Sequence, residues 1–408
     1  MPFIAQRVQN TPASPIRRLV PYAEAAKARG VDVFHLNIGQ PDIETPQTGV
    51  KALQEADLGV ISYSHSAGIL SYRKKLVEFY ARYEVEVNTE QMIVTNGGSE
   101  ALLFAMLACA NAGDEVIVPE PFYANYNGFA KSLDITIVPI TAHIEDGFAL
   151  PPMEDFEKKI TSKTRAILIC NPSNPTGYLY SKEELEQLRA IVQKHDLFLI
   201  ADEVYRDFCY EGQTHTSILS LEGMEDYAVV IDSISKRYSA CGARMGVVLS
   251  KNVAFIEQTM KLAQARLSPS TLAQILAEGL IETPPSYFEE VTEEYNKRRQ
   301  TVINRLQAME GVDCPNPKGA FYAFAQFPVD DCDKFCQWLL EEFDYEGKTV
   351  MMAPGAGFYN SAGLGKQEAR IAYVLHEDDL NAAMDCLEKA LAVYPGRLVT
   401  TSKDSTTV

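Results

Sequence analysis

Short runs of apolar and β-branched residues alternate with helix-like stretches between residues 90 and 250. Five such runs occupy residues 92–95, 115–118, 166–169, 198–201 and 229–232. Uninterrupted apolar runs are typical of strands buried on both faces, and their alternation with helices predicts a mainly parallel sheet covered by helices on each side. Such sheets bind ligands beyond the carboxyl ends of their strands. The pattern therefore predicts an α/β fold with its functional residues in the segments that follow these runs.

A different pattern begins after residue 285. Residues 287–309 have the spacing of a long amphipathic helix, and residues 319–324 and 350–355 have the apolar character of strands. A chain of 408 residues exceeds the size at which a single hydrophobic core stops growing, so two domains are expected. We expect a large domain over residues 46–285 and a smaller domain made of residues 1–45 and 286–396. Residues 397–408 lose the hydrophobic pattern and are predicted to be a disordered tail.

Composition and charge narrow the class of protein. Hydrophobic residues make up 46% of the chain and charged residues 23%, which is ordinary for a soluble globular protein. The net charge of -18 repels phosphate backbones, so nucleic acid is not an expected partner. The first residues lack the charged start, apolar run and cleavage site of a secretion signal, and no segment resembles a membrane span, so a cytoplasmic protein is expected.

The eight cysteines form no CxxC pair and have no histidines at zinc-site spacing. We expect free thiols and no metal.

Lys236 is the first candidate for covalent chemistry. Ser233 and Ser235 precede it closely, and Arg244 follows eight residues later. An amine of lowered pKa can bond to an aldehyde, while hydroxyl donors and a permanently ionised guanidinium suit a phosphate. The arrangement is typical of a lysine that binds pyridoxal phosphate. The short motif also has a simpler interpretation as a solvated lysine near serines.

A glycine turn follows the run at 92–95. Residues 96–100, Asn-Gly-Gly-Ser-Glu, stand between that run and a helical stretch. Glycines allow close approach of the backbone, and amides at a helix start carry partial positive charge that a phosphate can use. A plain capped turn is the alternative.

Two more candidate segments follow the next runs. Asn174 lies in the proline-rich turn 170–177, from which its amide can bond a phenolic oxygen or a carboxylate. Asp202 follows the run at 198–201 and precedes Tyr205 by three residues. A buried carboxylate there can keep a pyridine nitrogen protonated, and a protonated ring stabilises a carbanion at a substrate's α-carbon. Metal ligation by Asp202 and Glu203 is disfavoured because no histidine or third carboxylate lies at a useful spacing.

In this order, these motifs resemble those of the fold-type I, class I aminotransferases of the aspartate aminotransferase superfamily, and the resemblance extends over about residues 14–395. It implies the pyridoxal-phosphate transferase fold of type I, with a mainly parallel seven-stranded sheet flanked by helices in the large domain and a smaller α+β domain. It also implies that Lys236, Asp202 and Tyr205 are catalytic and that pyridoxal 5'-phosphate is the cofactor. The cofactor-binding residues implied in this way are Tyr63, Gly98, Ser99, Glu100, Tyr123, Asn174, Asp202, Tyr205, Ser233, Ser235, Lys236 and Arg244.

Tyr63 matches a tyrosine that family members lend to the phosphate of the partner subunit, so the resemblance implies a homodimer. On the substrate side it assigns Gly39, Asn174 and Arg370 to the α-carboxylate. A planar guanidinium facing a planar carboxylate forms two parallel hydrogen bonds, which fix the Cα–H bond relative to the cofactor ring. A surface salt bridge is the alternative for Arg370.

The residues expected to recognise the side chain of the substrate differ from those of relatives that take aspartate. Relatives that take aspartate commonly have Lys-Gln after the double glycine, whereas this chain has Ser99 and Glu100. We expect Arg17, or its neighbour Arg18, to bind a distal carboxylate instead. Two solvated arginines are the alternative.

The activity implied by the resemblance is transfer of an amino group from an L-amino acid to a 2-oxo acid by a ping-pong mechanism, with aspartate and 2-oxoglutarate or with a broader set of substrates. A lyase of the same fold, which cleaves a C–S bond or forms an aminocyclopropane carboxylate, would keep every cofactor residue and stays an alternative. A transcription regulator is not expected, because the roughly 13 residues before the resemblance are too few for a helix-turn-helix.

Overall fold

The computed structural model describes residues 2–12 and 14–398, so the predicted tail beyond residue 398 lies outside the described residues. The chain forms two compact units. Unit 1 comprises Met1–Pro12, Gln40–Glu294 and Lys318–Ala320, and unit 2 comprises Ala13–Gly39, Tyr295–Pro317 and Phe321–Val408.

Residues 40–45, 286–294 and 318–320, which were expected in the smaller domain, lie in unit 1. Two further differences from the sequence expectation are at the N-terminus and near residue 397. Residues up to 12 belong to unit 1, where Arg7 forms an ion pair of 3.9 Å with Asp134. Arg397, which was expected in the tail, forms an ion pair of 2.9 Å with Glu310 in unit 2. Both differences come from contacts between segments far apart in the sequence, which hydrophobic periodicity does not report.

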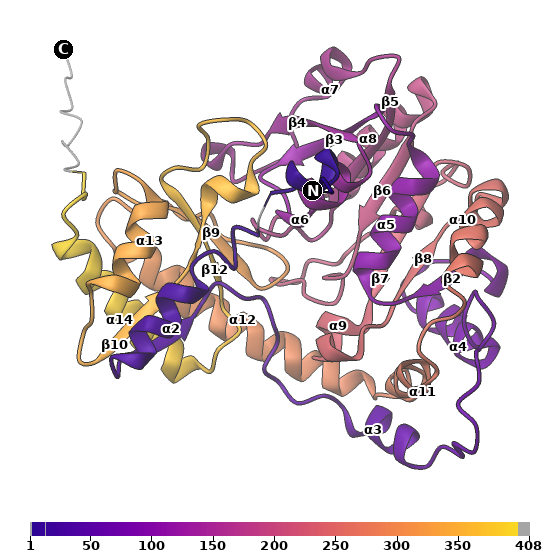
Figure 1. Cartoon of the computed structure of the whole chain (residues 1–408), viewed down its shortest axis with the longest axis horizontal. Coiled ribbons are helices and arrows are strands. Elements are labelled where there is room, and N and C mark those ends of the chain that lie inside the picture. Colours follow the sequence, from indigo (N-terminus) through magenta and orange to yellow (C-terminus); the bar gives the residue numbers. More distant parts are fainter. Residues whose placement is uncertain (1, 13, 399–408) are drawn as a thin grey trace. The chain divides into compact units, whose positions relative to one another are not determined.

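Unit 1 is built on a seven-stranded sheet (Figure 1), with strand order β2-β8-β7-β6-β5-β3-β4. Strands β4, β3, β5, β6 and β7 are parallel to their neighbours in that group, and β8 is antiparallel to both β7 and β2. The predicted mainly parallel sheet of seven strands is confirmed. The strands are β2 (Met92–Thr95), β3 (Glu115–Glu120), β4 (Thr136–Thr141), β5 (Thr164–Cys170), β6 (Phe198–Asp202), β7 (Ala228–Ser233) and β8 (Gly246–Leu249).

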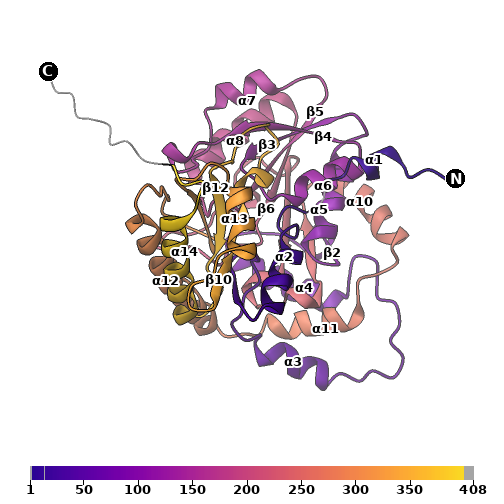
Figure 2. The same ribbon diagram turned by 60° about the vertical axis from the view of Figure 1, so that its left-hand side comes forward.

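Helices cover both faces of this sheet, as Figures 1 and 2 show. Successive residues of a buried strand point to opposite faces, so Ile167 packs with one helical layer and Leu168 with the other. The first layer contains α4 (Leu70–Ala81), α7 (Met153–Lys159), α8 (Lys182–His195) and α11 (Thr271–Leu280). The second contains α5 (Gly98–Cys109), α6 (Asn125–Ser132) and α10 (Val253–Ala265).

Unit 2 contains two small sheets. In one, β1 (Asp32–His35) pairs in parallel with β10 (Lys348–Met351). In the other, β12 (Glu368–Ala372) lies between β11 (Ala353–Pro354) and β9 (Tyr322–Gln326) and is antiparallel to both. The helices of this unit include α2 (Val20–Ala28), α13 (Cys332–Glu341) and α14 (Glu377–Val393). Together they form the expected α+β unit.

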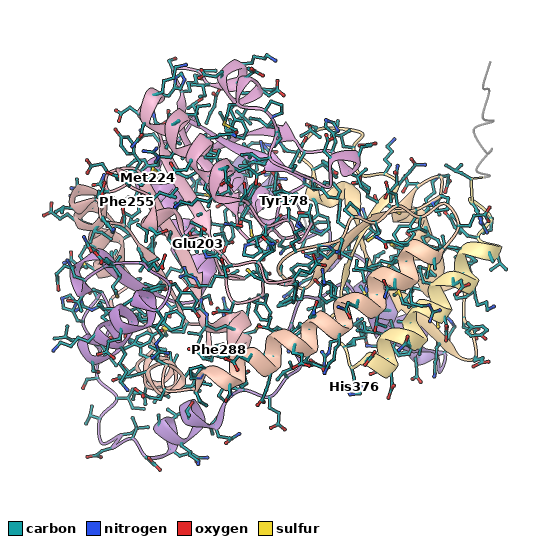
Figure 3. The ribbon with its side chains drawn as sticks, turned by 180° about the vertical axis from the view of Figure 1, so that it is seen from behind. Tyr178, Glu203, Met224, Phe255, Phe288 and His376 are labelled. Carbon is teal, nitrogen blue, oxygen red and sulfur yellow. The ribbon has the colours of Figure 1, made fainter. Side chains whose placement is uncertain are left out.

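The long helix predicted near residues 287–309 is α12 (Pro285–Ala308), which contributes residues to both units (Figure 3). The remaining elements are short: α1 (Gln6–Gln9), α3 (Gln47–Gln54), α9 (Ile234–Arg237) and the 3-10 turns η1 (Thr89–Gln91), η2 (Ile144–Asp146), η3 (Ile218–Ser220), η4 (Cys241–Ala243) and η5 (Gly355–Phe358). Within residues 2–12 and 14–398, no helix is both long and apolar enough to cross a membrane.

Candidate active site

Asp202 is the last residue of β6, and its two carboxylate oxygens have different surroundings. Oδ2 accepts a hydrogen bond of 2.9 Å from the hydroxyl of Tyr126. Oδ1 is buried and has no hydrogen-bond partner among the described residues. Burial raises the pKa of Asp202 to about 6, although the Tyr126 hydroxyl and the Val204 amide act in the opposite direction. A buried carboxylate oxygen without a partner is suited to a cationic N–H donor.

Lys236 lies in α9, directly after β7. Its Nζ is 3.8 Å from Sγ of Cys241 and 6.0 Å from the ring centre of Tyr205. The Tyr205 hydroxyl accepts a long hydrogen bond of 3.5 Å from Nδ2 of Asn174. Because β5, β6 and β7 are adjacent and parallel, the segments after them bring Lys236, Tyr205 and Asn174 to the same edge of the sheet.

Groups suited to an anion gather beside this edge. Gly98 and Ser99 begin α5, and a Cβ added to the preceding Gly97 would lie 2.5 Å from Nη2 of Arg244. The hydroxyls of Ser233 and Ser235 are 2.8 Å apart, and Cβ of Ser233 would be 3.7 Å from a Cβ added to Gly98. The start of a helix, two hydroxyls and a guanidinium together are a strong phosphate-binding arrangement.

Glu100 lies one turn into α5, and its carboxylate has protein partners. It accepts a hydrogen bond of 2.8 Å from the backbone amide of Asn96 and forms an ion pair of 3.5 Å with Nε of Arg266. Glu100 was expected among the cofactor-binding residues, and these contacts also connect it to the glycine turn. An anionic carboxylate would also repel a phosphate.

Tyr126 is a residue that the sequence interpretation missed. It lies in α6, is fully buried, and its ring is perpendicular to that of Tyr123 with the centres 5.4 Å apart. Asn125 donates a hydrogen bond of 2.7 Å to the Tyr123 hydroxyl. Tyr123 precedes α6, so helical spacing gave no signal for Tyr126.

Tyr63 is also in unit 1, and its side chain is 78% exposed. This exposure leaves its surface accessible to a second molecule.

Unit 2 contains the second group of predicted residues. Arg370 is in β12, is 2% exposed, and donates a hydrogen bond of 2.6 Å to the backbone oxygen of Asn37. Its guanidinium carbon is 4.5 Å from the ring centre of Tyr322 and 5.0 Å from that of Phe358. A Cβ on Gly39 would lie 1.8 Å from the Tyr322 hydroxyl oxygen, so the chain requires glycine there. The structure therefore brings Arg370, Gly39 and Tyr322 together.

Sequence reasoning gave Tyr322 no role beyond membership of a strand. Arg17 and Arg18 are both exposed, and Arg18 forms an ion pair with Asp333. A buried arginine such as Arg370 needs compensating contacts, which Asn37 and the two aromatic rings provide.

The sequence matches the family model described as aminotransferase class I and II over residues 31–387. The chain belongs to this family. It is similar to the aspartate aminotransferase of Pyrococcus horikoshii, with 33% identity, 95% of this chain covered and 97% of the relative. The structure of aspartate aminotransferase from Thermus thermophilus with maleate has 28% identity and a TM-score of 0.86, covering 96% of this chain and 100% of that one. Alanine aminotransferase from Pyrococcus furiosus has 31% identity and a TM-score of 0.87, covering 95% and 99%.

The protein is a pyridoxal-phosphate-dependent aminotransferase of fold type I, with an amino acid and a 2-oxo acid as substrates. The predicted family, cofactor and class of enzyme are thus confirmed, and the lyase alternative is not favoured. The geometry of unit 1 fits the cofactor. Asp202 Oδ1 suits a pyridinium N–H, and the start of α5, the hydroxyls of Ser233 and Ser235 and the Arg244 guanidinium packed against Gly97 suit a phosphate.

Proposed function

We propose that Lys236 bonds covalently to the cofactor and that Asp202 binds the protonated pyridine nitrogen. The observation that carries this proposal is the buried Oδ1 of Asp202, which has no partner in the described part of the chain while Oδ2 is bonded to Tyr126. When bound, pyridoxal phosphate withdraws electrons from the α-carbon of the substrate through its protonated ring. Asp202 maintains that protonation through a charge-assisted hydrogen bond.

Lys236 also moves the proton in this proposal. When the substrate amine has displaced it, Nζ would take the proton from the α-carbon and deliver it to the cofactor carbon on the same side of the ring. Its distance of 6.0 Å from the Tyr205 ring centre supports a location at the reacting face.

The other residues of unit 1 orient the cofactor. We assign the phenolic oxygen to Tyr205 and Asn174, whose side chains already meet at 3.5 Å. Tyr123 stacks on the ring. The phosphate-binding groups are the amides of Gly98 and Ser99, the hydroxyls of Ser233 and Ser235, and the guanidinium of Arg244.

In unit 2, Arg370 and Gly39 bind the α-carboxylate of the substrate. Asn174, in unit 1, is a further substrate-binding candidate. The aromatic rings of Tyr322 and Phe358 restrict the guanidinium plane, so two parallel hydrogen bonds can form at a small entropic cost. The fixed carboxylate selects which bond at the α-carbon breaks.

The amino donor we propose is aspartate, with 2-oxoglutarate as acceptor, or a broader set that includes them. Relatives named aspartate aminotransferase support this choice, and Arg17 is the candidate for the distal carboxylate. We expect Arg17→Ala to lower the ratio of kcat/KM for aspartate over alanine about tenfold, the effect of one lost charge-assisted contact. Arg18→Ala is the matched control, because Arg18 is paired with Asp333. Equal ratios in wild type and Arg17→Ala would exclude Arg17.

We also propose a cytoplasmic homodimer. Free cysteines suit a reducing compartment. Val60, Ile61 and Tyr63 are 87%, 57% and 78% exposed, which supports an apolar surface that a second copy covers. Sedimentation velocity should show a dimer with full cofactor occupancy, and a monomer of full activity would contradict this.

Absorbance spectra test the activity directly. Adding aspartate without an oxo acid should convert the lysine-bound cofactor to its amine form in one turnover and release one equivalent of oxo acid. Continuous release of ammonia without an acceptor would instead show a lyase.

A further inference from the structure

Arg237 directly follows Lys236, is 3% exposed, and has no place in the site described above. Its guanidinium forms an ion pair with Asp232, five residues earlier, and its Nε is 3.1 Å from Oδ2 of Asp207. The guanidinium carbon also lies 4.7 Å from the ring centre of Phe79. The Asp232 and Arg237 side chains therefore bracket the segment that contains Lys236.

The helix that carries Lys236 is too short to be stable by itself. α9 has four residues, and a single turn fixes several dihedral angles for very few hydrogen bonds. Ser233 caps it by accepting a hydrogen bond of 3.1 Å from the Ser235 amide. The remaining constraint comes from side chains that bind the end of the turn, and Arg237 is the residue at that end.

Asp232 connects the same turn to the strand that carries Asp202. Its Oδ2 accepts a hydrogen bond of 2.7 Å from Tyr80 and lies 3.7 Å from Nε of Arg206. Arg206 in turn donates a hydrogen bond of 2.8 Å to Glu203, the residue after Asp202, which Figure 3 shows among the strands. Burial alone would raise the pKa of Asp232, but Arg237 and Arg206 keep it below its usual value, so the pairs are ionised.

We propose that Arg237 is a positioning residue for Lys236. By binding Asp232 and Asp207 at once, it holds the Lys236 turn in register with β6, so Nζ stays aligned with the cofactor bound by Asp202. This inference rests on the proposed role of Lys236. Arg237 hydrogen-bonds to Asp232, and its contact with Asp207 is an ion pair without hydrogen-bond geometry. A broad, permanently charged guanidinium can lie against two carboxylates on different segments, whereas the lysine ammonium is a single point charge.

The test compares Arg237→Lys and Asp207→Asn with the wild-type holoenzyme. We expect kcat to fall about 10- to 100-fold while KM stays within about twofold, because misalignment affects the transition state more than binding. The bond between Lys236 and the cofactor absorbs light differently when its nitrogen is protonated. In the substrate-free enzyme, the pH midpoint of this absorbance change should shift by about 0.5 unit or more, because protonation of the nitrogen depends on how the bond is oriented to the ring.

Arg299→Lys is the control for a purely structural effect. Arg299 is a buried arginine of unit 2 whose Nη1 donates hydrogen bonds of 2.9 Å to Asn316 and Pro317. The Arg299→Lys substitution should lower the melting temperature without moving the absorbance midpoint or kcat.

If the Arg237 and Asp207 variants behave like this control, Arg237 has only a structural role and the proposal is overturned. If Arg237→Lys does not fold, Asp207→Asn decides alone. If wild type itself shows no lysine-bound absorbance, the proposed function fails instead.

Discussion

Tyr126 donates a hydrogen bond to one oxygen of Asp202 and leaves the other oxygen for a ligand. The bond also opposes the rise in the pKa of Asp202 that burial causes. Tyr126→Phe should therefore raise this pKa above about 6 and weaken binding of pyridoxal phosphate to the apoenzyme about tenfold, the usual cost of a lost hydrogen bond to a buried charge. Titration of each apoenzyme with pyridoxal phosphate measures this affinity. Tyr180→Phe, another buried tyrosine of unit 1, is the control, and equal affinities in both variants would argue against Tyr126.

The buried carboxyl group of Glu203 leads to a separate prediction, about the pH dependence of stability. Burial raises its pKa to about 7, although Arg206, the Ile218 amide and Ser217 act to lower it. Between the ordinary pKa of 4.5 and this value, the folded state keeps a proton that the unfolded state releases, so stability falls as pH rises. The free energy of unfolding of wild type should decrease relative to Glu203→Gln by about 1–3 kcal/mol between pH 5 and 8. Urea denaturation measures it.

Exposed Glu290→Gln should show no such trend. A constant difference between wild type and Glu203→Gln across this range would mean that Glu203 has an ordinary pKa.

At the scale of single residues, the sequence was informative where a motif and a backbone position coincide. Lys236, Gly98 and Asp202 stand next to recognisable strands, so their location could be predicted. Tyr126, Arg237 and Tyr322 acquire importance only through contacts with distant segments. No local pattern marks such contacts, and the ion pair of Glu100 with Arg266 could not be predicted for the same reason.

The glycine turn before α5 gives a prediction at the scale of one element. Gly97 has a φ of 80°, and a Cβ there would lie 2.5 Å from Arg244. Gly113 has a φ of 89° and open space around it. Both alanine variants place a side chain at a positive φ, which favours glycine. At Gly97 the ψ of 170° is in a region essentially restricted to glycine, with a backbone strain of about 1–3 kcal/mol. Only Gly97→Ala should displace Arg244.

We therefore expect Gly97→Ala to lower affinity for pyridoxal phosphate about tenfold or more, the value of a displaced charge-assisted contact, with no change in Gly113→Ala. Fluorescence titration of the two apoenzymes provides the comparison. Similar affinities would mean that the turn does not shape the phosphate site.

The elements that the sequence predicted are those with strong periodicity. Residues 166–169 of β5 and 198–201 of β6 are apolar because both faces of the sheet are covered. The helix α12 is long enough for its period to be clear. β4 was missed because it is an edge strand that contains Pro139, and β8 was not among the predicted runs. The four-residue helix α9 is too short to show a hydrophobic period, and its formation depends on contacts with the surrounding structure.

For the whole molecule, length and alternation were sufficient to predict two units and the class of fold. The division of the chain between them was less predictable, because residues 2–12 join unit 1 through contacts such as Arg7 with Asp134. The negative net charge describes the exterior, whereas the groups proposed for anionic ligands are local and include Arg244 and the buried Arg370.

The central claim is the covalent attachment of pyridoxal phosphate to Lys236. Borohydride reduction of the purified holoenzyme, followed by digestion and mass spectrometry, tests it most directly. We predict one pyridoxyl label, on the peptide that contains Lys236, and no label in Lys236→Ala, which should still bind the cofactor but lose transamination. A label on another lysine, or undiminished turnover of Lys236→Ala, would contradict the account.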